Sequence, residues 1–282
     1  MDTVLRLLFY EMLGLGLIAT VVKSFTWRDY LKKPRKAAQG KLLRSAGDSF
    51  QRETQILNDW LMGLLAGIVA TPAILLGQMP HTIDGRSMAI MAVAIVAWAV
   101  PLIYLLGFRR NLQLGLRAKR AMAEELSLLM RDGCYVFHDY PTGPSQSIDH
   151  VIVAPSGIYA IETNGRRKKG FSGNKNAELS FNGTQIGFSG GHGESELVEL
   201  ARRNAVELSR ELTAAGAENI TVNPILTFPG WNIIRTGKGD VNVLTAEEIR
   251  ATVTAADKPA LSPAQIQRLA SQIEQKCRDI EL

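Results

Sequence analysis

Residues 148–164 read IDHVIVAPSGIYAIETN, and this stretch decides the fold of the surrounding chain. Two apolar runs are joined by a Pro-Ser-Gly turn, so the stretch is predicted to form an antiparallel β-hairpin. If Val153 lies opposite Ile158, counting outward places Asp149 opposite Glu162. Directly opposed residues of an antiparallel pair point to the same face, with Cβ atoms about 5 Å apart.

The paired acids are the first candidate functional residues. Two ionised carboxylates at this spacing repel each other, so either one holds a proton or a cation lies between them. Carboxylate oxygens suit Mg²⁺ or Mn²⁺, which makes Asp149 and Glu162 candidate metal ligands. A register shifted by one residue would put the acids on opposite faces. The alternative is two ordinary surface acids, with Glu162 paired to Arg166 or Arg167.

The first part of the chain has the composition of a membrane region. The chain has 282 residues and a mean hydropathy of +0.02, and its apolar residues concentrate in the first 110 positions. Segments 3–22, 56–79 and 88–108 are each apolar over about 20 residues, the length that crosses the hydrocarbon layer. We therefore predict three transmembrane helices in a membrane region, 1–110, followed by a separate domain, 111–282.

Basic residues predict the orientation of these helices. They cluster between the first two spans and again after the third, at Lys23, Arg28, Lys32, Lys33, Arg35, Lys36, Lys41, Arg44, Arg52, Arg109, Arg110, Arg117, Lys119 and Arg120. Because basic loops stay on the cytoplasmic side, we expect a multi-pass protein of the inner (plasma) membrane with a cytoplasmic C-terminal domain. A cleaved signal peptide is the alternative for the first span, although the flanking basic cluster opposes translocation.

Two features inside the predicted spans concern helix association. Gly63 and Gly67 form a GxxxG pattern, which lets helices approach closely and favours a homo-oligomer through the membrane helices. Glu11 lies inside the first span, where a carboxylate is costly unless it is paired. It indicates either an interhelical hydrogen bond or a functional group.

The remaining sequence predicts a mixed α/β domain. Expected helices and strands alternate along the chain, which is typical of a sheet flanked by helices. Asn182-Gly183 predicts a second tight hairpin. Two capping boxes, Thr245 with Glu248 and Ser262 with Gln265, predict the starts of the last two helices. The other expected elements are a helix at 117–131, a strand at 134–140, a helix at 194–212 and strands at 220–228 and 240–244.

Residues of about 111–245 resemble the nuclease-related domain (NERD) family, a relative of the restriction-endonuclease-like nucleases. The similar segments are GLRAKRAMAEEL at 115–126, YVFHDY at 135–140, the hairpin at 148–164, Asn182-Gly183, LARRNA at 200–205 and ILTFPGW at 225–231. The resemblance implies a restriction-endonuclease-like mixed sheet. It also implies metal-dependent hydrolysis of phosphodiester bonds, with Asp149 and Glu162 holding Mg²⁺ or Mn²⁺.

Three positions depart from the family pattern. The lysine of the Asp…Glu-x-Lys core is replaced by Asn164, a usual glutamate is Lys119, and a usual glutamine is Leu200. Asn164 shares a face with Glu162 and can still hydrogen-bond a water or a phosphate. The missing positive charge is expected from Lys119 or from the following lysines of the basic run.

The basic run Arg166, Arg167, Lys168 and Lys169 follows the carboxylates closely, and we expect it to bind the backbone of DNA. Its alternative is a solvated loop. Three functions are therefore open at this point. They are a membrane-anchored nuclease, a catalytically degenerate nucleic-acid-binding or scaffold module, and a membrane-assembly protein in which Glu11 contacts a partner.

Overall fold

The structure is a computed structural model that describes residues 43–78, 85–143, 146–167, 177–188, 193–215, 220–255 and 260–278. The predicted span 3–22, with Glu11, lies outside the described residues, as do Lys168 and Lys169. The chain divides into two compact units, Met1–Lys36 with Arg52–Leu112, and Ala37–Gln51 with Gln113–Leu282. The second unit thus includes residues 37–51, which the sequence analysis placed in the membrane region.

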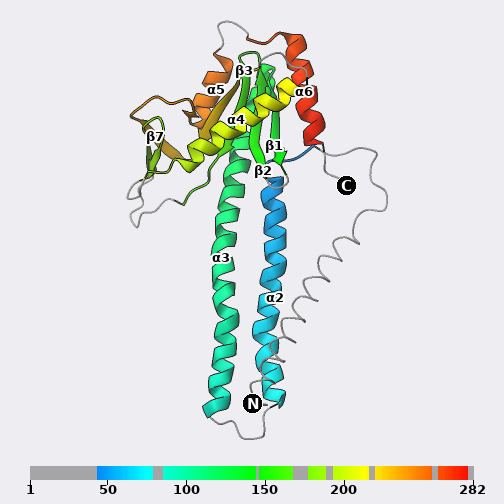
Figure 1. Ribbon diagram of the computed structural model, residues 1–282, viewed down its shortest axis with the longest axis vertical. Coiled ribbons are helices and arrows are strands. Elements are labelled where there is room, and N and C mark those ends of the chain that lie inside the picture. Colours follow the sequence, from blue (N-terminus) through cyan, green and yellow to red (C-terminus); the bar gives the residue numbers. More distant parts are fainter. Residues whose placement is uncertain are drawn as a thin grey trace, which may run out of the picture. The chain divides into compact units, whose positions relative to one another are not determined.

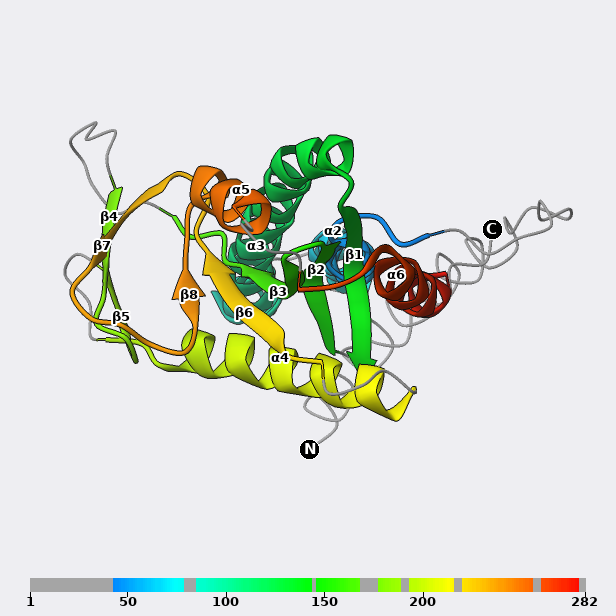
Figure 2. The same ribbon diagram turned by 90° about the horizontal axis from the view of Figure 1, so that it is seen from above.

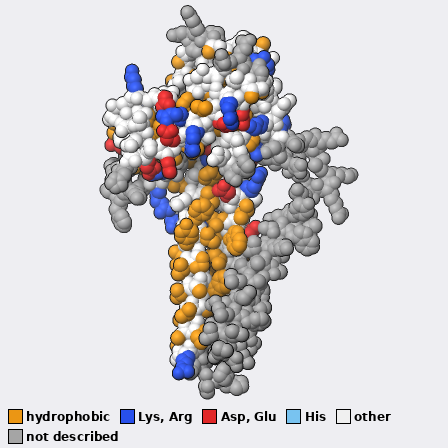
Figure 3. Space-filling model, viewed as in Figure 1, with side chains coloured by type: hydrophobic (Ala, Val, Ile, Leu, Met, Phe, Trp, Pro, Cys, Tyr) orange, Lys and Arg blue, Asp and Glu red, His pale blue; other side chains and the backbone are white. Residues whose placement is uncertain are grey.

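The first unit contains most of two long helices, α2 (Asp48–Gln78) and α3 (Gly85–Ser127) (Figure 1). Within this unit, Arg109 Nε donates to Asn58 Oδ1 over 2.7 Å. Figure 3 shows many apolar side chains on the surface of this unit. The exposed large apolar residues include Ile56, Trp60, Met62, Leu65, Val69, Val93, Val96, Val100, Ile103 and Tyr104. A surface of this kind is unusual for a helix in water and ordinary for one in lipid.

One stretch in the described part of the chain, Met88–Asp132, is long and apolar enough to cross a membrane. The described residues therefore contain one candidate span rather than the three that the sequence predicts. The predicted span 88–108 lies within α3, and residues 56–78 of the second predicted span lie within α2. Gly63 and Gly67 of the GxxxG pattern are buried in this structure.

The second unit is built on a five-stranded mixed sheet. Its strand order is β1-β2-β3-β6-β8, with β1, β2 and β3 antiparallel and β3, β6 and β8 parallel. The strands are β1 (Tyr135–Gly143), β2 (Gln146–Ala154), β3 (Gly157–Thr163), β6 (Val222–Thr227) and β8 (Asn242–Val243). The hairpin β2–β3 has the predicted register, because Val153 pairs with Ile158.

Helices cover both faces of this sheet, so the predicted mixed α/β class with flanking helices is confirmed (Figure 2). One face packs on α4 (Glu196–Ala214) and α6 (Pro263–Cys277). The other packs on the end of α3, the 3₁₀ turn η1 (Leu128–Asp132) and α5 (Ala246–Thr254). The hairpin strands are buried on both sides, which explains why their sequence is apolar almost throughout.

Local signals in the sequence account for the ends of several elements. Both predicted capping boxes are present and open α5 and α6. The predicted hairpin is present: Asn182 and Gly183 lie in the loop 182–185 between β4 (Ala177–Phe181) and β5 (Ile186–Phe188), and Gly183 has φ +102°. With β7 (Trp231–Arg235) these strands form a second, three-stranded sheet in the order β5-β4-β7.

Candidate active site

The two hairpin acids come together as the register requires. Asp149 lies on β2 and Glu162 on β3, and their exposed fractions are 4% and 7%. The backbone N–H of Thr163 donates to Asp149 Oδ2 over 2.8 Å, which ties the first acid to the strand that carries the second. Both carboxyl groups are therefore held by strands of the central sheet and almost withdrawn from water.

Lys119 of α3 supplies a positive charge to this pair. Its Nζ lies 2.5 Å from Asp149 Oδ1, and the residue is only 5% exposed. A lysine is buried in this way only when its ammonium has a partner, because an isolated buried charge is strongly unfavourable. Among the described candidates for the missing positive charge, Lys119 is the one that lies against Asp149.

Asn204 completes the cluster from α4, which packs on the opposite face of the sheet from α3, and it is not among the residues predicted from the sequence. It is buried on α4, and its Nδ2 donates to Glu162 Oε1 over 2.6 Å. The signal was available, because Asn204 is a polar residue on the apolar stripe formed by Ala201, Ala205 and Leu208. Leu200, one of the departures from the family pattern, lies one helical turn before Asn204 and is partly exposed.

Burial dominates the electrostatics of the pair. Removal from water raises the pKa of Glu162 well above its usual value, and the neighbouring Asp149 carboxylate raises it further. Burial also raises the pKa of Asp149, while the Lys119 ammonium and the Thr163 N–H oppose that change. Of the two acids, Asp149 has the Lys119 ammonium as its direct counter-ion, whereas Glu162 accepts from the neutral Asn204 amide.

Asn164 lies where β3 ends. Its backbone N–H donates to the carbonyl of Thr227 over 2.9 Å, so it continues the pairing of β3 with β6. The next residue, Gly165, passes close to α3, because a Cβ there would lie 2.7 Å from the Leu114 carbonyl oxygen and 2.8 Å from the Ala118 Cβ. The structure thus fixes the backbone at Asn164 between the sheet and the helix that carries Lys119.

The two described residues of the basic run, Arg166 and Arg167, differ in their contacts. Arg166 forms an ion pair with Glu194, and its guanidinium lies 4.0 Å from the centroid of the Phe188 ring. Arg167 is exposed. Arg202 of α4 pairs with Glu199 and Asp240.

The histidines form a separate pair. His138 and His150 sit opposite each other on β1 and β2, with their Nδ1 atoms 2.8 Å apart. Burial lowers the pKa of both imidazoles. Successive residues of a strand point to opposite faces, so His150 does not join Asp149. Within the described ranges, no group of three or more His, Cys, Asp or Glu side chains is arranged to hold a metal ion.

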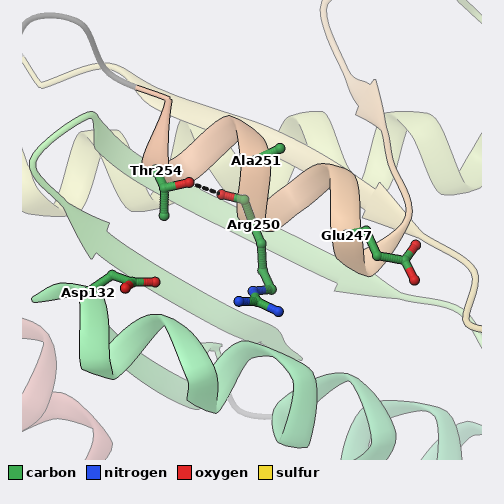
Figure 4. Close-up of a pocket in the computed structure, with 5 residues that line it drawn as sticks. All are labelled: Asp132, Glu247, Arg250, Ala251 and Thr254. Atoms are coloured by element: carbon green, nitrogen blue, oxygen red, sulfur yellow. Dashed lines mark hydrogen bonds between the residues drawn. The ribbon is translucent and has the colours of Figure 1, made fainter.

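A cavity of about 250 Å³ lies elsewhere on the second unit, between the end of η1 and α5. Figure 4 shows its lining residues Asp132, Glu247, Arg250, Ala251 and Thr254. None of the predicted site residues that the structure describes lines it, so the carboxylate cluster and this cavity are separate features.

The second unit is thus a mixed α/β domain with a buried pair of acids on its central hairpin. In a comparison with protein families, the model described as "Nuclease-related domain" (NERD) matches residues 114–229. The match contains Lys119, both hairpin acids, Asn164 and Asn204, and it confirms the resemblance for this segment. Comparisons with curated proteins and with solved structures found no match.

Proposed function

We propose that this chain is a membrane-anchored nuclease that hydrolyses phosphodiester bonds of DNA with the help of Mg²⁺ or Mn²⁺. One observation carries the proposal. Asn164 has replaced the lysine of the Asp…Glu-x-Lys pattern, yet Lys119 reaches the same acids from α3, with Nζ 2.5 Å from Asp149 Oδ1. The residue types of the pattern, two acids and one lysine, are retained although the lysine has moved.

The donor set fits a divalent cation. Asp149 and Glu162 present carboxylate oxygens from adjacent strands on one face, and such oxygens are the ligands that Mg²⁺ and Mn²⁺ prefer. The two acids would hold the ion, which lowers the pKa of a bound water and stabilises negative charge on the phosphate. Asn204 orients Glu162 through its amide, and the Thr163 N–H orients Asp149.

The chain's own residues supply the remaining functions. Lys119 favours the ionised form of Asp149 and offers an ammonium that can orient the attacking water or the phosphate. Asn164, at the end of β3, is a second hydrogen-bonding group on the face of Glu162. Arg167 is exposed and suits backbone contact, together with Lys168 and Lys169, whereas Arg166 must first leave its Glu194 partner.

The membrane anchor is part of the proposal. The apolar stretch in α3 begins after Arg86 and ends at Arg109 and Arg110, as expected of a span with basic residues at its boundaries. We infer that residues 56–79 and 3–22 form further spans, giving a multi-pass protein of the inner membrane. The restriction-endonuclease-like domain would then face the cytoplasm, where DNA is accessible.

Cleavage by the full chain in detergent micelles tests the enzyme proposal. Supercoiled plasmid, linear duplex and single-stranded RNA would be incubated with Mn²⁺, Mg²⁺ or EDTA. We expect metal-dependent DNA cleavage that falls by about 100-fold or more in Asp149→Asn and in Lys119→Met, since each removes a charge at the reacting phosphate. Lys276→Met is the matched control, because Lys276 pairs with Glu211 elsewhere in the unit.

A second function is favoured by the same ion pair. The Lys119 ammonium already neutralises Asp149, so the fold is satisfied without a metal, as a non-cleaving DNA-binding or scaffold module would require. Salt-sensitive DNA binding without cleavage by the folded wild-type chain would establish this function and refute the first. The next variant would then be Asn164→Lys, which restores the lysine to β3.

A further inference from the structure

Lys119 has a second close neighbour besides Asp149. Its Nζ lies 3.7 Å from the centroid of the Phe50 ring. A cation over an aromatic face is attracted by the negative potential of the ring, most strongly where water is excluded. Because Lys119 is only 5% exposed, its ammonium is enclosed between an aromatic face and a carboxylate.

Phe50 lies in the first turn of α2, and that turn is attached to the central sheet. The backbone N–H of Ser49 donates to Asp139 Oδ2 over 2.9 Å, and its Oγ donates to Asp139 Oδ1 over 2.7 Å. A carboxylate at a helix N-terminus satisfies an otherwise unpaired N–H and interacts favourably with the helix dipole. Ser147 of β2, close to Asp149, also donates to Asp139 Oδ1 over 2.7 Å.

The Phe50 ring packs against the backbone of α3 at Gly115. A Cβ at Gly115 would lie 2.9 Å from Phe50 Cε1, so the ring rests against a helix position that has no side chain. Gly115 is one helical turn before Lys119, on the same side of α3. Next to Phe50, Gln51 accepts a hydrogen bond of 2.8 Å from Arg120 Nη2.

We propose that Phe50 is a positioning residue that holds the Lys119 ammonium beside Asp149. This inference deepens the proposed nuclease function and rests on it for its catalytic meaning. Phe50 lies outside residues 114–229, the segment that matches the nuclease-related domain. The complete site therefore needs a turn that the chain supplies before α3, at the start of the apolar helix α2.

A fluorination series at Phe50 tests the proposal in the full chain. Mono-, di- and trifluorinated phenylalanine keep the size of the ring almost unchanged and withdraw electron density from its face in steps. The readout is the rate at which Lys119 is acetylated by a trace of acetic anhydride, measured by mass spectrometry against Lys276 in the same sample. We expect the Lys119 rate to rise in steps to a total on the order of tenfold, the factor of a desolvated cation–π contact.

The same series at Phe137, a core residue of β1, is the matched control and should leave the Lys119 rate unchanged. A flat Lys119 rate across the Phe50 series would overturn the proposal, because a ring that only fills space does not respond to fluorination. Phe50→Trp, which keeps an aromatic face, should protect Lys119 better than Phe50→Leu.

The DNA cleavage assay separates this inference from the proposed function. If the wild-type chain cleaves, the Phe50 series should lower kcat with little change in KM, because Phe50 does not touch the substrate. If the wild-type chain does not cleave, the nuclease proposal fails, and the stepwise labelling of Lys119 still decides whether Phe50 positions it.

Discussion

Removal of the Lys119 ammonium should destabilise the second unit strongly. Lys119→Met keeps most of the side-chain volume and leaves Asp149 as a buried carboxylate without its counter-ion, next to Glu162. Both partners of the ion pair are about 5% exposed or less, so solvent cannot replace the lost contact. Breaking one side of such a buried pair costs about 3–5 kcal/mol. For a unit of this size each kcal/mol lowers Tm by about 2–4 °C, so we expect a decrease of roughly 6–20 °C.

The unfolding of the second unit can be measured through its buried thiols. Both cysteines of the chain, Cys134 and Cys277, are buried in the second unit. A dye that fluoresces on reaction with thiols therefore reports the unfolding of this unit in detergent. The exposed ion pair of Arg202 with Asp240 is the control. Because solvent screens exposed pairs, Arg202→Met should lower Tm by no more than about 2–4 °C.

A double variant tests the reason for the loss. Lys119→Met with Asp149→Asn removes both charges and keeps an oxygen that accepts from the Thr163 N–H. Replacement of a whole buried pair is often nearly neutral, so the double variant should recover most of the lost stability. The reasoning is refuted if Lys119→Met melts within about 2 °C of the wild type, or if the losses of the two single variants simply add.

Three further predictions concern the neighbouring residues. The pKa of Glu162 is raised above 4.5, so the folded state binds its proton more tightly than the unfolded state does. Stability should then fall by up to about 1.4 kcal/mol per pH unit as pH rises from the unfolded-state pKa of Glu162, 4.5, towards its higher folded-state pKa. Glu162→Gln should remove this slope when Tm is measured as a function of pH. Gly165→Ala should cost about 1–3 kcal/mol in the same assay, because its Cβ would lie 2.7 Å from the Leu114 carbonyl oxygen; an unchanged Tm would contradict the packing described. Arg167→Ala should reduce the salt dependence of DNA binding by about one counterion, whereas Arg166→Ala should change it less because Arg166 pairs with Glu194; equal effects would show that this ion pair does not persist on binding.

The sequence alone determined the features whose causes are local. The Pro-Ser-Gly turn sets the hairpin register, which places Asp149 and Glu162 on one face, and the two capping boxes start α5 and α6. Each of these depends on residues a few positions apart, so the preferences of the backbone and of nearby side chains are enough to predict them. The mixed α/β class followed for the same reason, from the order of the elements along the chain.

Only the tertiary structure decided which charges and rings surround the acids. Lys119 on α3 and Asn204 on α4 reach the hairpin acids from two helices, and Phe50 on α2 contacts Lys119. Their positions depend on how each helix packs on the sheet, and a register or a turn says nothing about that packing. The sequence offered several lysines to replace the charge missing at Asn164. Among the described residues, Lys119 is the lysine that lies against Asp149, and its burial there makes the ion pair a strong one to break.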